Sequence, residues 1–175
     1  MNVSHTVVDS PLGPITLVAH DDALAGLYFA LSPRRLGTAR AGARDDAPFG
    51  NAIEQLGQYF RRERTTFDLP LAPRGNTFEA RVWQLLQRIP YGETRSYGQL
   101  AAELGDRRLA RAVGTANARN PVGIIVPCHR VIGADGKLVG YAGGLERKRF
   151  LLELEGALQG GQMALEGLSA PRAES

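Results

Sequence analysis

The chain of 175 residues contains a single cysteine, Cys128, and it has no long hydrophobic run. One cysteine cannot form an intramolecular disulfide or supply a cysteine-rich zinc site, so we expect no metal. No stretch approaches the roughly 18–20 apolar residues of a membrane span, and residues 1–5 show no signal-peptide pattern. These absences predict a cytoplasmic protein that does not contact a membrane.

The sequence also lacks the glycine-rich motifs that hold nucleotide cofactors, because no G-x-G-x-x-G precedes a helix and no phosphate-binding loop is present. We therefore expect no cofactor. The chain does have an ordinary globular composition, with 43% hydrophobic and 22% charged residues, which is enough to form a core. Its formal net charge of +3 slightly favours a polyanionic partner.

The hydrophobic patterning predicts a two-part α+β protein. Residues 1–74 are expected to form a small N-terminal antiparallel sheet with a helix, ending in a Pro-rich linker. The period of Ile53, Leu56 and Phe60 predicts the amphipathic helix, and Ser32–Gly50 is predicted to be a loop because it has no clean period. Apolar runs predict strands over residues 3–8, 15–19, 24–29 and 66–69.

Residues 75–156 are expected to form a mainly helical C-terminal domain, with a helix-turn-helix and short strands around Pro127-Cys128-His129-Arg130. Capping pairs at Asn76/Glu79 and Ser96/Gln99 predict two helix starts, and Gly105 predicts a helix end. The remaining predicted elements are a helix over about 107–117, a buried strand over 122–126 and a last helix over 145–155. Residues 157–175, rich in Gly, Ala and Ser, are predicted to be a flexible tail.

The helix predicted over 107–117 has an unusual outer face. On a helical wheel Leu109, Ala112, Val113 and Ala116 share one side, and the opposite arc carries small and basic residues: Arg107, Arg108, Ala110, Arg111, Gly114, Thr115 and Ala118. One interpretation is a solvated basic face. The other is a DNA contact, because arginines attract phosphates and small residues allow close approach. So smooth a face suits the minor groove better than base recognition in the major groove.

Cys128 lies at the end of an apolar run and directly before His129. A single buried cysteine can be a small core residue, but an adjacent imidazole can also generate the reactive thiolate. In a regular strand these two side chains would point to opposite faces. We therefore expect either a kink after Pro127 or a water between sulfur and imidazole.

Glu155 falls within the apolar arc of the last predicted helix. It could fray into solvent before Gly156, or it could be buried and paired, because an unpaired buried carboxylate is costly. With His129 as its partner it would complete a Cys-His-Glu relay. Asn120 could brace the same segment, or it could simply form an Asn-Pro turn with Pro121.

Several motifs resemble those of the O6-alkylguanine-DNA alkyltransferases. They are Pro127-Cys128-His129-Arg130-Val131, Asn120-Pro121, Gly143-Gly144-Leu145, Ser96-Tyr97, and the stretches 89–94 and 110–114. The resemblance covers about residues 75–156. It implies direct repair of double-stranded DNA, in which an alkylated guanine is flipped out of the duplex and its O6-alkyl group passes to the protein's own cysteine. It also implies a monomer that reacts irreversibly once, on O6-alkylguanine and O4-alkylthymine.

The resemblance assigns roles by matching position. Cys128 would accept the alkyl group, His129 would act as a base through a water, Glu155 would orient it and Asn120 would order the segment. Arg111 would replace the flipped base, and Tyr97 would press on the DNA backbone and donate a hydrogen bond to the leaving guanine. Further DNA contacts would come from Ala110, Gly114, Thr115 and Ala118, and the substrate pocket would be lined by Val131, Tyr141, Ala142, Gly143 and Lys148.

Two departures and two alternatives accompany this resemblance. Some relatives hold zinc through N-terminal cysteines that this chain lacks, and Ala142 stands where some carry a hydroxyl. One alternative function is a lesion sensor that binds alkylated DNA without transfer. The other is a cysteine hydrolase that uses Cys128, His129 and Glu155.

Overall fold

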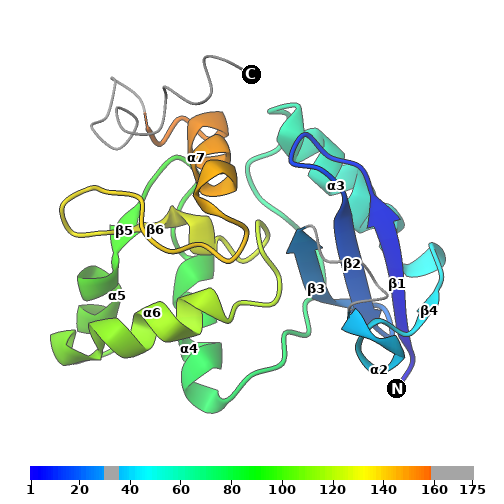
Figure 1. Cartoon of the computed structure of the whole chain (residues 1–175), viewed down its shortest axis with the longest axis horizontal. Coiled ribbons are helices and arrows are strands. Elements are labelled where there is room, and N and C mark those ends of the chain that lie inside the picture. Colours follow the sequence, from blue (N-terminus) through cyan, green and yellow to red (C-terminus); the bar gives the residue numbers. More distant parts are fainter. Residues whose placement is uncertain (30–35, 159–175) are drawn as a thin grey trace. The chain divides into compact units, whose positions relative to one another are not determined.

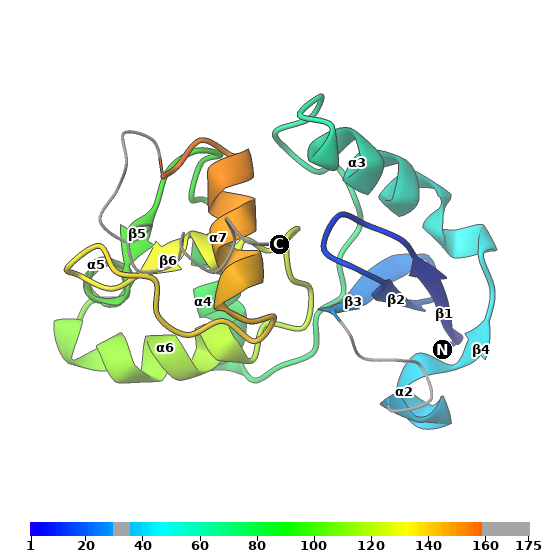
Figure 2. The ribbon, with the colours of Figure 1, turned by 45° about the horizontal axis from the view of Figure 1, so that its top comes forward.

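The computed structural model describes residues 1–29 and 36–158, which form two compact units. The first comprises Met1–Gly75 and Pro121–Ile125, and the second comprises Asn76–Asn120 and the described chain from Val126 onward. Strands dominate the first unit and helices the second (Figures 1 and 2). The predicted two-part α+β class is confirmed.

The first unit is built on a four-stranded sheet in the order β3-β2-β1-β4 (Figure 1). The three antiparallel strands follow one another in sequence, and β4 adds a short parallel edge to β1. The β1–β2 turn closes because Gly13 takes a left-handed φ of +94° and Ser10 Oγ hydrogen-bonds within the turn. The strands are β1 (Val3–Val8), β2 (Ile15–His20), β3 (Ala23–Phe29) and β4 (Ala43–Arg44).

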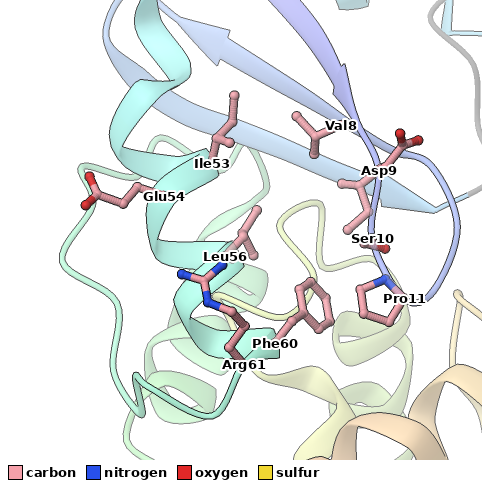
Figure 3. A pocket seen from close by; sticks show the side chains of 11 residues that line it. Val8, Asp9, Ser10, Pro11, Ile53, Glu54, Leu56, Phe60 and Arg61 are labelled. Carbon is pink, nitrogen blue, oxygen red and sulfur yellow. The ribbon is translucent and has the colours of Figure 1, made fainter.

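The helix α3 (Gly50–Phe60) turns a different face to the core than its sequence period predicted. Ala52, Leu56 and Tyr59 are buried, whereas Ile53 is 39% exposed. The helix rotates this way because the Tyr59 ring is buried and packs against neighbouring aromatic rings. Ile53 instead lines a pocket of about 530 Å³ between α3 and the β1–β2 turn (Figure 3).

Two further predictions for the first unit are wrong. The predicted loop 32–50 contains α2 (Thr38–Ala41), β4 and a 3-10 turn at Ala47–Phe49, because Ala41 and Phe49 anchor the segment in the core. Residues 32–35 of that loop lie outside the described residues. The predicted strand 66–69 does not form, and Leu71 makes a single bridge with Leu24 instead.

The second unit is mainly helical, and both predicted capping boxes are confirmed at Asn76 and Ser96. Trp83 Nε1 donates to Ala116 O at 2.9 Å, which ties the first helix of this unit to the helix that contains residue 116. The elements are α4 (Thr77–Gln87), β5 (Arg95–Ser96), α5 (Tyr97–Glu103), η2 (Arg107–Leu109), α6 (Ala110–Ala118), η3 (Cys128–Arg130), β6 (Val131–Ile132) and α7 (Leu145–Leu154).

Three boundaries differ from the sequence-based expectations. The helix predicted from 107 starts as the 3-10 turn η2, and only α6 is α-helical. Residues 122–126 are buried but not a strand, because Ile124 takes a left-handed φ of +70° that breaks the extended run. Leu158, expected in a flexible tail, is buried with Leu138 and Leu152. In the described ranges, no helix has the length and apolarity to cross a bilayer.

Candidate active site

The Pro-Cys-His-Arg segment forms η3, a single 3-10 turn that follows Pro127. Cys128 N donates to Val126 O at 2.8 Å, and Arg130 N donates to Pro127 O at 3.0 Å. The chain is therefore kinked at this point, so Cys128 and His129 are not held on opposite faces of a strand. Both residues are buried, at 6% and 0% exposure.

His129 and Glu155 form the pair that the sequence suggested. His129 Nε2 lies 2.8 Å from Glu155 Oε2, and both side chains are fully buried. Glu155 follows α7 directly as its C-terminal capping residue. The alternative of a carboxylate frayed into solvent is therefore excluded.

The surroundings of this pair fix its protonation at neutral pH. Burial alone would raise the pKa of Glu155, but the hydrogen bonds and charges of His129 and Arg130 hold that pKa at about 2. Burial lowers the pKa of His129, against the opposing effect of Glu155. An ionised carboxylate accepts hydrogen bonds only, so Nε2 carries the ring proton and Nδ1 is left as a base. Nδ1 is buried and has no hydrogen-bond partner among the described residues.

The Cys128 thiol is protonated in the resting protein. Burial raises its pKa, while a hydrogen bond from the Asn120 side chain and the positive charge of Lys148 oppose that rise. A thiol in this environment needs a base to become a nucleophile. Asn120 and Lys148 are placed to stabilise the anion once the proton leaves.

Two asparagine side chains hold the segment around the thiol. Asn120 Nδ2 donates to Val126 O at 2.7 Å, and Asn117 Nδ2 donates to Cys128 O at 3.4 Å. Sequence reasoning missed Asn117. Its position four residues after Val113 places it on the inner face of α6, and a buried Asn on such a face is the signal that was available.

Lys148 and Tyr97 meet at one backbone carbonyl in the loop before α7. Lys148 Nζ donates to Val139 O at 2.8 Å and to Gly140 O at 3.1 Å, and Tyr97 Oη donates to Val139 O at 3.2 Å. Burial lowers the pKa of Lys148 to about 8, although Cys128 acts in the opposite direction. Burial raises the pKa of Tyr97, and a thiolate on Cys128 would raise it further.

The other residues expected in the substrate pocket lie on the two segments that flank this carbonyl. Val131 is buried in β6, which pairs in parallel with β5 just before Tyr97. Burial raises the pKa of Tyr141 well above its usual value, and a thiolate on Cys128 would raise it further. Ala142 is exposed, and Gly143 accepts a hydrogen bond from Arg147, a residue that sequence reasoning missed.

The outer face of α6 is open to solvent. Arg111 is exposed and forms no ion pair with any described residue, and Thr115 and Ala118 are exposed beside it. Ala110 and Gly114 are half-buried. A Cβ on Gly114 would lie 3.7 Å from the Tyr97 ring, an ordinary contact distance, so α6 passes beside Tyr97 at this residue. Ala112, expected on the inner side, is exposed. No three metal-ligating side chains converge anywhere in ranges 1–29 and 36–158.

Comparison with known proteins gives a consistent result over nearly the whole chain. Two sequence-family models of the 6-O-methylguanine DNA methyltransferase match this chain. The model of the DNA binding domain matches residues 77–157, and the model of the ribonuclease-like domain matches residues 3–73. The methylated-DNA–protein-cysteine methyltransferase of Mycolicibacterium paratuberculosis is 51% identical over 156 residues, which cover 87% of this chain and 92% of that protein. The protein of the same name from Methanosarcina acetivorans is 46% identical over 153 residues, covering 87% and 98%.

Solved structures agree. The Mycobacterium tuberculosis O6-methylguanine methyltransferase superposes with a TM-score of 0.79 at 48% identity, covering 94% of this chain and 99% of that one. The structure of Mycobacterium tuberculosis OGT in complex with DNA has a TM-score of 0.77, with the same identity and coverages of 89% and 93%.

Proposed function

This chain belongs to the 6-O-methylguanine DNA methyltransferase family, as its motifs indicated, and we propose that it repairs DNA by moving the methyl group of O6-methylguanine onto Cys128. One observation carries the proposal: the buried Cys128 is followed in the chain by the buried His129, whose Nε2 is committed to Glu155. This arrangement leaves Nδ1 of His129 as the base.

The reaction begins with the thiol proton. It passes from Cys128 to Nδ1 of His129 through one water, and Glu155 stabilises the imidazolium that forms. The sulfur then attacks the methyl carbon, so that one S–C bond forms and the C–O6 bond breaks. Guanine leaves with the electron pair of that bond and takes up one proton, which balances the proton lost by the thiol. The products are S-methylcysteine and unmodified guanine.

The transfer happens once per molecule. A thioether has no leaving group that water can displace easily, and the chain has no second cysteine to accept the methyl group. The protein is therefore consumed in equal numbers with the lesions that it repairs.

The outer face of α6 is the proposed DNA contact. Arg107, Arg108 and Arg111 supply phosphate attraction, and the small residues between them allow close approach to the minor groove. The target base must leave the stack to reach a thiol that is only 6% exposed. Arg111 then occupies the space left in the duplex, with the other contacts from Ala110, Gly114, Thr115 and Ala118.

The flipped base is held by the loop before α7, whose backbone carbonyls accept hydrogen bonds from Lys148 and Tyr97. The proposed pocket consists of Val131, Tyr141, Ala142, Gly143 and Lys148, with Tyr97 donating to the leaving guanine and Asn120 ordering the thiol segment. O4-alkylthymine presents the same chemical feature, an alkyl group on an exocyclic ring oxygen, and is the second proposed substrate. The protein acts as a monomer, since all of these residues lie in one unit of one chain.

Intact-mass measurement after incubation with a duplex containing O6-methylguanine tests the proposal. We expect a gain of one methyl group on the Cys128 peptide, with no turnover beyond one equivalent. Tight binding of the lesion without a mass change would identify a sensor. Repeated turnover of an ester or amide would identify a hydrolase, and either result would overturn methyl transfer.

A further inference from the structure

We propose that Arg130 positions the Glu155 carboxylate and sets the lowest pH at which His129 can accept the thiol proton. This inference rests on the proposed methyl transfer. Arg130 belongs to the Pro-Cys-His-Arg motif, yet the reaction described above gives it no task. It is a buried arginine, only 6% exposed, and a charge in that environment requires an explanation.

The guanidinium grips the carboxylate with two parallel hydrogen bonds. Arg130 Nε donates to Glu155 Oε1 at 2.8 Å, and Nη2 donates to Oε2 at 3.0 Å. His129 Nε2 approaches the same Oε2 at 2.8 Å. A bidentate pair fixes the plane of the carboxylate as well as its position, so the oxygen that faces His129 cannot rotate away.

The remaining nitrogen of the guanidinium, Nη1, links this pair to the turn that follows α4. Nη1 donates to Ile89 O at 2.6 Å, and the guanidinium lies 5.8 Å from the centre of the Tyr91 ring. Tyr91 Oη in turn donates to Leu154 O at 3.3 Å, at the end of α7. The turn after α4, the active-site turn η3 and the end of α7 thus meet at one guanidinium. A lysine could not make this set of contacts, because its ammonium offers no planar fork.

The charge of Arg130 matters as much as its geometry. A neutral His129 with an ionised Glu155 would be a buried group of net charge −1, and burial strongly favours uptake of a proton by such a group. Arg130 makes the three side chains neutral as a set. An extra proton on either His129 or Glu155 weakens the base, so removal of the Arg130 charge moves the loss of activity to higher pH.

The other charges around His129 act in known directions. Glu155 raises its pKa, whereas Arg130 and Lys148 lower it, and burial lowers it most. The Cys128 thiol is neutral until it reacts. Lys148 remains protonated over the acid range in the wild type and in the Arg130 variants, because its own pKa is about 8. A shift of the acid limit in an Arg130 variant therefore reports on Arg130 itself.

The test is the single-turnover rate of methyl transfer to the full chain between pH 5 and pH 8, at saturating duplex that carries O6-methylguanine. Arg130→Gln removes the charge and keeps a donor, Arg130→Lys keeps the charge and loses the fork, and Arg119→Gln is an exposed control. We expect the wild type and Arg119→Gln to lose activity only below the ordinary histidine pKa of about 6.5. Arg130→Gln should lose it about one pH unit higher. Arg130→Lys should keep the wild-type limit at a lower maximal rate.

Several results would overturn the inference. One is a loss of wild-type activity that already begins at or above pH 6.5. This result does not depend on whether any variant folds. Another is a rate of Arg130→Gln reduced by the same factor at every pH, which would mean a purely structural arginine. A limit that moves up equally in Arg130→Lys would remove charge as the cause. Absence of transfer by the wild type at all pH values would overturn the proposed function itself, and with it this inference.

Discussion

The two units of the molecule bury different kinds of polar group. Among the described residues the first unit buries hydroxyls, on Ser4, Thr6 and Thr16. The second buries ionisable side chains, namely His129, Arg130, Lys148, Arg149 and Glu155. A buried hydroxyl costs little when it is hydrogen-bonded, whereas each buried charge costs several kcal/mol unless it is well paired. His129 and Arg130 directly follow Cys128 and pair with Glu155, which is why we propose that the chemistry occurs in the second unit.

The formal charge of the chain, counted over buried and exposed residues together, follows the same division. Residues 1–75 contain eight basic and eight acidic side chains, whereas residues 76–158 contain twelve and eight. The positive charge of the chain therefore lies in the unit that carries α6. The pocket of the first unit is lined mainly by apolar side chains, and its Ser10 is already hydrogen-bonded within the β1–β2 turn (Figure 3). The ionisable lining residues are Asp9, Glu54 and Arg61, and Arg61 pairs with Glu63, which does not line the pocket. Such a set is weak evidence for a reaction.

The largest effect should come from the thiol. Cys128→Ala should abolish methyl transfer completely, because no other cysteine exists in the chain. Binding to undamaged duplex should stay within about threefold of the wild type, a change below 1 kcal/mol, because the thiol is buried away from the DNA-binding face. Intact mass and fluorescence anisotropy measure the two properties. A methylated Cys128→Ala protein would show that the charged core is not where the reaction occurs.

The next largest effect concerns the buried carboxylate. Glu155→Gln should lower the free energy of unfolding by about 3–5 kcal/mol at pH 7, because it leaves the Arg130 charge without its partner. The pKa of Glu155 is about 2 when folded, against an ordinary 4.5, so its contribution is complete above pH 4.5 and disappears towards pH 2.

The difference between Glu155→Gln and the wild type should therefore narrow by about 3 kcal/mol between pH 5 and pH 2. Urea unfolding at several pH values measures this. Glu63→Gln is the matched control in the first unit, where the ion pair with Arg61 is exposed and contributes little to stability. A constant difference across the pH range would contradict the depressed pKa of Glu155.

Lys148 should also make stability rise with pH, but in the alkaline range and because burial penalises its charged form. Its pKa is lowered to about 8 in the folded protein from an ordinary 10.5, so the buried charge costs stability fully below pH 8. Between pH 8 and pH 10.5 the folded protein has released a proton that the unfolded chain still holds, and the wild type gains about 3 kcal/mol. The free energy of unfolding of Lys148→Met should not rise between pH 8 and pH 10.5. Lys137→Met, at the only other lysine and an exposed position, should keep the rise of the wild type.

Arg111 tests the DNA side of the same unit. Arg111→Ala should slow transfer from duplex about 10- to 100-fold, equivalent to roughly 1.4–2.8 kcal/mol, because the flipped base then has no replacement in the stack. Its affinity for undamaged duplex should fall only about threefold. Arg107 is exposed on the same face, and Arg107→Ala should lower the transfer rate and the affinity for undamaged duplex by similar factors. Equal losses for Arg111→Ala would argue against an intercalating role.

The sequence predicted the helical unit well because its signals are local. Capping boxes at Asn76 and Ser96 and the stop at Gly105 depend on residues three or four apart, and the structure confirms all three. The His129–Glu155 pair was found by a local signal too, a carboxylate on an apolar helical face. The family resemblance added a proposed role for each residue, which geometry alone does not supply.

What the sequence could not give depends on distant contacts. The strand predicted over 122–126 fails at Ile124, whose left-handed conformation has no local signature in a β-branched residue. Arg130 was the more serious omission. Its proposed role in positioning Glu155 requires Ile89, Tyr91 and Glu155 to lie close together in space. Their spacing along the chain does not predict this.

The smallest predicted effect lies in the first unit. Ile53→Ala should lower the free energy of unfolding by less than about 1 kcal/mol, because the side chain is 39% exposed at the mouth of the pocket. Leu56→Ala on the same helix should cost about 2–5 kcal/mol, because Leu56 is buried at 3% exposure. Both folded variants should transfer methyl groups within about twofold of the wild-type rate, a difference of roughly 0.4 kcal/mol. Slower transfer by Ile53→Ala, with its stability unchanged, would mean that the pocket of the first unit takes part in the reaction.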